Sequence, residues 1–113
     1  MTRLVEWFVR ARCVGRLVKV LQACPSGPVE VLGDDVLAGL LRKRLGARVS
    51  PTIVESPTVI IDASGSSERI EDALRRLDDL GTLVLTRKVH GGQASVNPYT
   101  DLHFRSLTII GVN

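Results

Sequence analysis

Four short apolar runs, separated by segments of helical periodicity, constrain the fold of this chain more than any other feature. They are Val29–Leu32, Thr58–Asp62, Thr82–Thr86 and Leu107–Gly111. A continuous apolar run is typical of a strand that is buried on both faces of a parallel sheet. Parallel strands need long, usually helical connections, and the segments between the runs have the helical spacing of apolar residues. The sequence therefore predicts an α/β fold, an open parallel sheet with flanking helices.

The length and the leading segment indicate how the chain is organised. Its 113 residues suit one compact domain, residues 1–113. Residues 1–24 have the periodicity of an amphipathic helix, and Trp7 and Phe8 give that helix an apolar side that can cover one face of the sheet. Basic residues between the apolar ones leave a second interpretation open, a helix on a membrane surface. Strands and helices then alternate over residues 29–113.

Cap and turn residues mark where the later helices begin and end. Gly46 ends the helix that follows the first strand, Ser66 caps the next helix, and Gly81 ends it. Residues 48–55 contain Pro51, which cannot donate to a strand ladder. This stretch therefore predicts a brief edge strand or an irregular connection, so the sheet is shortened in its second-strand region.

The composition argues against two classes of partner. The net charge is +3, but aromatic residues make up only 4% of the chain, so no stacking platform for nucleic-acid bases is expected. The basic stretch Arg42–Arg44 fits a solvated helix end, whereas nucleic-acid binding through it and the first helix would show a steep salt dependence. No apolar run reaches membrane-spanning length and no signal peptide is evident, so we expect a cytoplasmic protein.

A glycine turn follows the first strand, where dinucleotide-binding folds hold a phosphate. In the G-x-G-x-x-G fingerprint the second glycine lets the backbone approach a pyrophosphate, and the third lets helix and strand pack closely. The turn begins with Gly33, but the other two positions are Asp35 and Ala38. Two like charges about 4 Å apart repel by about 4 kcal/mol at an effective dielectric of ~20. The turn therefore keeps the outline of a dinucleotide site without its chemistry.

The nucleophilic and metal-ligating residues form no recognisable catalytic pattern. Cys13 and Cys24 lack a metal-ligand spacing and are expected to be buried, reduced thiols. His90 lies in a glycine-containing loop, and His103 precedes the last strand, with Asp101 close enough in sequence to meet it. Neither histidine specifies a triad or a metal site. We therefore predict no catalytic residue and no bound metal.

Four segments, taken in order, resemble the coenzyme domain of the medium-chain, zinc-type alcohol dehydrogenases. They are Val31–Gly33, Ile60–Ser66, Gly81–Leu85 and Asp101–Gly111, and the last is the most specific. The resemblance runs from about Val29 to the C-terminus and implies a Rossmann-like domain. In that family the last strand joins two coenzyme domains into one sheet, which implies a homodimer through Leu107 to Val112.

Three departures from the family argue against a working dehydrogenase. The altered phosphate turn is the first. The second is that the separate catalytic domain, which holds the zinc ligands and the proton relay, has no counterpart in this sequence. The third departure is that residues 49–57 replace the section that carries the ribose-binding acid in the family. Glu55 is a candidate for that role, and an ordinary solvated glutamate is the competing interpretation.

What remains is a vestigial crevice beyond the carboxyl ends of the strands, where open α/β sheets bind ligands. Its candidate cofactor-binding residues are Gly33, Asp34, Asp35, Ala63, Ser64 and Gly65. Ser64 lacks the G-x-S-x-G pattern of a nucleophile, so it and Ser66 are interpreted as turn and cap residues. We expect a non-catalytic, dehydrogenase-derived accessory or binding protein without a cofactor, in a metabolic pathway such as one of specialised metabolism. The alternative is an NAD(P)-binding subunit of an oxidoreductase whose catalytic residues come from a partner enzyme.

Overall fold

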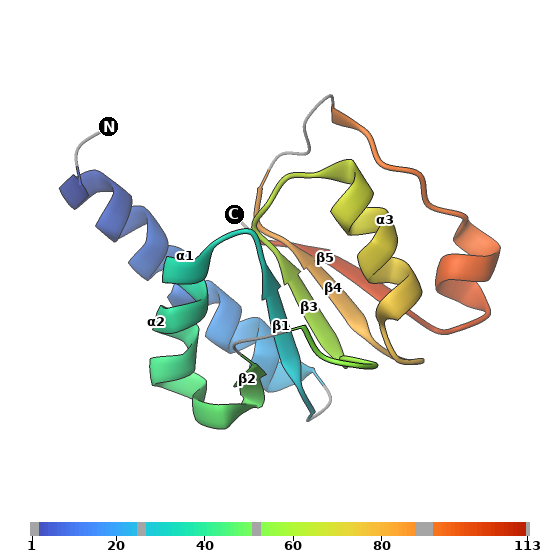
Figure 1. The fold of residues 1–113 in the computed structure, drawn as a ribbon, viewed down its shortest axis with the longest axis horizontal. Helices are drawn as coiled ribbons and strands as arrows, with labels where there is room; N and C mark the ends of the chain where they lie inside the picture. The colour runs from blue at the N-terminus through green and yellow to red at the C-terminus, as the bar shows by residue number, and fades with distance from the viewer. Residues whose placement is uncertain (1–2, 25–26, 51–52, 88–91, 113) are drawn as a thin grey trace.

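The computed structural model describes residues 3–24, 27–50, 53–87 and 92–112, with side chains from Arg12 onward. In these residues five parallel strands form one sheet in the order β2-β1-β3-β4-β5 (Figure 1). The strands are β1 (Val29–Leu32), β2 (Val49–Ser50), β3 (Val59–Asp62), β4 (Thr82–Leu85) and β5 (Thr108–Gly111). The predicted α/β fold is confirmed. The chain passes from β1 outward to β2 and then returns to the other side of β1, so the strand order reverses between β1 and β3.

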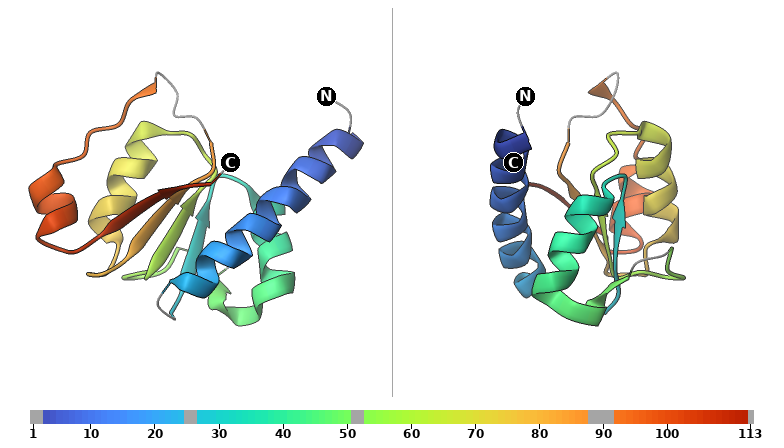
Figure 2. Two further views of the ribbon diagram at one scale, coloured as in Figure 1. Left: turned by 180° about the vertical axis from the view of Figure 1, so that it is seen from behind. Right: turned by 60° about the vertical axis from the view of Figure 1, so that its left-hand side comes forward.

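Helices cover both faces of the sheet. The helices α1 (Arg3–Ala23) and α2 (Asp35–Leu45) pack on one face, and α3 (Ser67–Arg76) covers the other (Figure 2). The short helical turn η3 (Pro98–His103) and the extended segment before it add apolar side chains to the core under α3. The strands β1, β3 and β4 therefore send side chains into two separate cores.

The strand β3 shows why the apolar runs are continuous. Its side chains Val59 and Ile61 belong to the core under α1 and α2, whereas Ile60 belongs to the core under α3. All three are fully buried. The same alternation holds in β4, where Val84 and Leu83 point to opposite cores. A strand with one solvated face would instead alternate apolar and polar residues.

The second-strand region is as short as its sequence predicts. The strand β2 has only two residues and lies at the edge of the sheet, beside the start of β1. A short turn, η1 (Gly46–Arg48), leads into β2 from α2. Residues 53–58 then lead back to β3, where the amide of Thr58 donates to the carbonyl of Pro28 at 3.2 Å. Pro51, whose position suggested an edge strand, lies outside the described residues.

Two of the three predicted helix ends are confirmed and one is wrong. Ser66 caps α3 through its side chain, and Gly46 ends α2 with a φ of 68°. Gly81 does not end α3, which stops several residues earlier. Leu80 takes the left-handed conformation instead, with a φ of 67°, while a Cβ on Gly81 would lie 2.7 Å from the carbonyl oxygen of Asp78. Close packing, and not helix termination, explains this glycine.

The C-terminal half of α1 is an integral part of the core. Leu17 and Leu21 are fully buried, and Val14 is nearly so. The N-terminal turns of α1 extend past α2 (Figure 1), and the predicted apolar side at Trp7 and Phe8 concerns side chains outside the described part of the chain. Among the described residues no helix is long and apolar enough to cross a membrane.

Replacing Leu17 with Ala tests the contribution of α1 to the core. The truncation leaves a cavity beneath the helix, so we expect the free energy of unfolding to fall by about 2–5 kcal/mol. Urea unfolding followed by circular dichroism measures this loss. The control is Lys19→Ala, an exposed change on the same helix, which should stay within about 0.5 kcal/mol of the wild type. Equal effects of the two substitutions would contradict the assignment.

Candidate functional site

The turn that leaves β1 lies where the strand order reverses, which is the usual ligand crevice of an open α/β sheet. Gly33 has a φ of 85°, and a Cβ on it would lie 2.5 Å from the Cα of Ser64. The amide of Ala63 donates to the carbonyl of Leu32 at 2.8 Å, which ties the ends of β1 and β3 together. The structure thus brings the predicted residues of both strand ends into contact, and Ser64 fills the space beside Gly33.

The N-terminus of α2 carries two carboxylates. Asp34 is the N-cap, and its side chain accepts a hydrogen bond from the amide of Leu37 at 3.0 Å. Asp35 follows in the first helical turn and is exposed. A helix N-terminus has a partial charge of about +0.5 and attracts anions. The carboxylates of the protein itself therefore occupy the position that favours a phosphate in a dinucleotide site.

The turn after β3 is organised by the buried carboxylate of Asp62. One of its oxygens accepts hydrogen bonds from the hydroxyl of Ser64 at 2.5 Å and from the Ser64 amide at 3.2 Å, and the other accepts from the amide of Gly65 at 3.2 Å. The Ser64 hydroxyl oxygen in turn accepts from the amide of Ser66 at 3.1 Å. These bonds hold Ser64 within its own turn, consistent with the role of a turn residue.

These two turns do not fit a dinucleotide pyrophosphate. Ser64 fills the approach to Gly33, and a helix amide at Leu37 already donates to Asp34. The carboxylate of Asp35 adds a negative charge where the phosphate would lie. Close backbone approach, free amide donors and positive potential are the features that a phosphate site requires, and each is altered here.

The sequence patterns did not predict the ion pair between Glu30 and Arg76 on the α3 face of the sheet. The two carboxylate oxygens of Glu30, on β1, accept hydrogen bonds from Arg76, on α3, at 2.9 and 2.7 Å. One of them also accepts from the amide of Val54 at 2.9 Å. The hydrogen bond to Glu30, assisted by one from Arg76 to Asp72 at 2.8 Å, raises the pKa of Arg76, so its guanidinium stays charged. The sequence does contain a signal for this pair. Glu30 lies within an apolar strand, and a buried carboxylate needs a partner of opposite charge.

A cavity of about 630 Å³ lies between α2, β1 and β2. Three of its lining residues, Asp35, Ala38 and Arg42, are spaced by three and four positions, so one face of α2 forms a wall. The Nε atom of Arg42 donates to the carbonyl of Val49 at 3.4 Å, which places the guanidinium at the β2 end. Among the predicted cofactor-binding residues, Asp35 alone lines this cavity.

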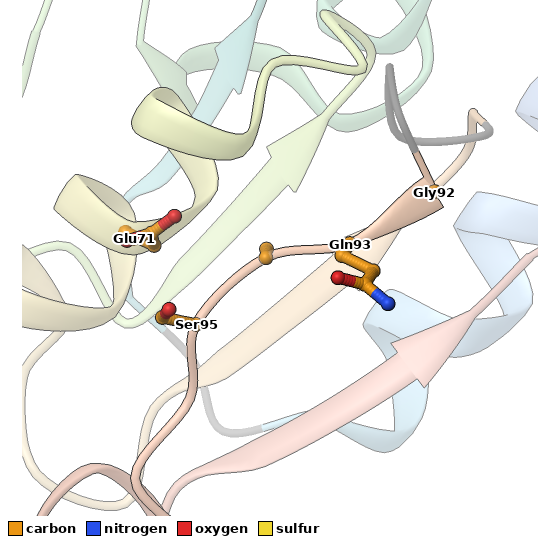
Figure 3. A pocket seen from close by; sticks show the side chains of 5 residues that line it. Glu71, Gly92, Gln93 and Ser95 are labelled. Carbon is orange, nitrogen blue, oxygen red and sulfur yellow. The ribbon is translucent and has the colours of Figure 1, made fainter.

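A second hollow, of about 520 Å³, lies between α3 and residues 92–95 (Figure 3). Glu71 projects from α3 and Ser95 from the neighbouring extended segment, whereas Gln93 is directed away from Glu71 (Figure 3). Within the described part of the chain, no buried side-chain nitrogen or oxygen lacks a hydrogen-bond partner. The described lining of this hollow is open to solvent and holds one carboxylate, Glu71, one hydroxyl, Ser95, and the amide of Gln93.

The two cysteines are free thiols but are half-buried, not buried as predicted. Burial raises the pKa of the Cys13 thiol, and the negative charge of Asp34 raises it further. A raised pKa keeps the thiol protonated, whereas the thiolate is the nucleophilic and metal-binding form. Cys13 therefore has the environment of a structural cysteine.

The histidines form no triad in the part of the chain that the structure describes. The ring of His103 stacks on that of Tyr99, with a centroid distance of 5.8 Å. Asp101 accepts a hydrogen bond from the amide of Asn97 at 2.7 Å instead of meeting His103. His90 lies outside the described residues, and among those described no group of His, Cys, Asp and Glu is placed to hold a metal ion.

A double-mutant cycle on Glu30 and Arg76 tests the ion pair. Arg76→Gln leaves the buried carboxylate of Glu30 without its charge partner, so it should lower the free energy of unfolding by about 3–5 kcal/mol. Glu30→Gln should cost less, because Arg76 is partly exposed and keeps its bond to Asp72. The double variant should lose less than the sum of the two, because the pair is removed together. Arg75→Gln, an exposed neighbour on α3, is the control. Additive losses in urea unfolding would show that the two residues do not interact.

Comparisons with known proteins support the fold. No protein-family model and no curated protein sequence matches this chain. The structure is similar to that of the D-arabinose dehydrogenase from Sulfolobus solfataricus, with a TM-score of 0.65 and 14% sequence identity, over 93% of this chain and 44% of that protein. This chain thus spans less than half the length of that dehydrogenase. At this identity the similarity concerns the fold alone, and the chain has a Rossmann-like α/β fold similar to part of a dehydrogenase.

Proposed function

We propose that this protein is a non-catalytic, dehydrogenase-derived binding protein that serves as an accessory factor in the metabolism of small molecules. One observation carries the proposal. At the reversal of strand order, Ser64 packs against Gly33 and Asp35 stands in the first turn of α2, so the crevice is altered where a dinucleotide would lie. Around this altered crevice the described residues still form a parallel sheet that is covered on both faces.

The chemistry of the described side chains supports a role without catalysis. The Ser64 hydroxyl bonds to Asp62 within its own turn, and the Cys13 thiol is kept protonated by burial. His103 stacks on Tyr99 and has no acidic partner among the described residues. A catalytic site needs a nucleophile or base within hydrogen-bond reach of an orienting group, and the described residues offer no such arrangement around the crevice or the cavity.

A variant that restores the fingerprint tests the proposed role of Asp35. Replacing both Asp35 and Ala38 with Gly removes the charge and the side chains at these two positions while leaving Ser64 in place, so the double variant should bind NADH or NADPH more tightly than the wild type. Fluorescence titration measures the two dissociation constants. For the wild type we expect values above about 1 mM, weaker than about −4 kcal/mol.

A matched control and two contradicting outcomes make this experiment decisive. Asp35→Asn is the matched control, since it removes the charge but keeps the side-chain volume, and it separates repulsion from steric hindrance. Wild-type binding of NADPH at micromolar concentration would overturn the non-catalytic proposal and favour the alternative, an NAD(P)-binding subunit whose catalytic residues come from a partner enzyme. The absence of any gain in the double variant would contradict the assignment of Asp35 as the block.

We also propose that two copies of this chain pair through β5. This strand lies at the end of the sheet order, and in the described residues only β4 pairs with it. The amides of Thr108 and Val112 donate to carbonyls on the β4 side, at 3.0 and 2.8 Å. Successive backbone amides of a strand point to opposite sides within the plane of the sheet, so the amide of Ile109 faces away from β4. An exposed edge with free donors and apolar side chains invites pairing with a second chain.

Sedimentation equilibrium of the wild type and of Ile109→Pro tests this dimer. Proline removes the outward donor while leaving the bonds to β4 in place, so the variant should be monomeric at concentrations where the wild type is dimeric. Ile109→Val keeps the donor and should remain dimeric. A wild type that is monomeric at micromolar concentration would refute the proposal, and a dimeric proline variant would exclude β5 as the interface.

A further inference from the structure

We propose that the cavity between α2, β1 and β2 binds a short zwitterionic peptide of about three residues, with its ammonium group at Asp35 and its carboxylate at Arg42. This inference rests on the proposed function, because it names the class of ligand that a non-catalytic binding protein of this shape would take. It concerns the cavity of about 630 Å³ and not the altered crevice at the Gly33 turn.

The two ends of the cavity carry opposite charges. Asp35 is exposed, and its carboxylate has no hydrogen bond or ion pair with any described residue. Arg42 donates to the Val49 carbonyl through Nε alone, which leaves its two terminal amino groups without a partner in the described chain. The carboxylate of Asp35 alone exceeds the partial charge of about +0.5 at the helix N-terminus. That end therefore attracts a cation, and the Arg42 end attracts a carboxylate.

The spacing of the two residues along α2 motivates the length of the ligand. Asp35 and Arg42 are seven positions apart, which corresponds to a rise of about 10 Å between their backbones along the helix axis. An extended chain spans about 3.3–3.6 Å per residue, so three residues cover a similar length.

Apolar side chains also line the cavity. Val31, Ala38 and Ile53 line it, and the side chain of Ile53 is 77% exposed, so a bound apolar group would cover it. Glu30 also borders the cavity, but both of its oxygens are engaged by Arg76 and Val54. Its charge is therefore not available to a ligand, and Asp35 and Arg42 remain as the two points of recognition.

Titration of the full chain with Ala-Val-Ala, followed by chemical-shift changes in its amide spectrum, tests this inference. The N-acetylated peptide lacks the ammonium group and the C-terminally amidated peptide lacks the carboxylate. Each should bind about 10-fold more weakly than Ala-Val-Ala, which corresponds to about 1.4 kcal/mol. The shifts should fall on α2 and β1. No binding of Ala-Val-Ala, or equal binding of all three peptides, would overturn the inference.

Matched variants assign each end of the peptide to its residue. Asp35→Asn should weaken binding of Ala-Val-Ala and remove its sensitivity to acetylation, whereas Arg42→Gln should remove its sensitivity to amidation. Lys43→Gln, an exposed neutralisation on the same helix, should change neither. Urea unfolding confirms that the variants are folded. Binding of AMP without binding of Ala-Val-Ala would also refute this inference, whereas the proposed function fails separately, through tight binding of NADPH by the wild type.

Discussion

The hydrogen-bonded ion pair between Glu30 and Arg76 is the interaction on which the arrangement of this fold depends. Glu30 lies on β1, which is covered on both faces, and only 2% of its surface is exposed. A charge in such a place is tolerated only when it is paired and its lone pairs are satisfied. Arg76 supplies two donors and the amide of Val54 a third. The same contacts join β1, the helix α3 and the connection that returns to β3.

This interaction explains how the connection from β2 to β3 is held in place although the second-strand region is so short. Only two residues form β2, and residues 53–58 cross back to β3 without a helix of their own. The bond from the Val54 amide to Glu30 fixes that crossing, and the bond between Thr58 and Pro28 fixes its end. The short edge strand also leaves one face of α2 uncovered, which forms a wall of the cavity lined by Asp35 and Arg42. The shortened sheet and the cavity thus have one structural origin.

The elements that the sequence predicts well are those whose signals are local. Continuous apolar runs identify β3 and β4, and the cap at Ser66 and the glycine at Gly46 locate two helix ends, because these depend on neighbouring residues alone. Gly81 was misassigned for the opposite reason. Its need for space comes partly from the Asp78 carbonyl, three residues earlier, and partly from the Thr58 carbonyl, 3.1 Å from a Cβ at this position. The contact with Thr58 joins residues far apart in the sequence, so no local pattern predicts it.

The sequence by itself determined the alternation of strands and helices, the altered phosphate turn and the lack of a metal-ligand pattern. Each of these features depends on residues that are close to one another along the chain. Only the tertiary structure decided that Ser64 packs against Gly33, that Glu30 pairs with Arg76, and that Asp35 and Arg42 border one cavity. The physical reason is separation: Glu30 and Arg76 lie on different elements, and their charges meet only after the sheet and its covering helix have formed. Even Asp35 and Arg42, which share a helix, line a cavity because β2 is short enough to leave their face open.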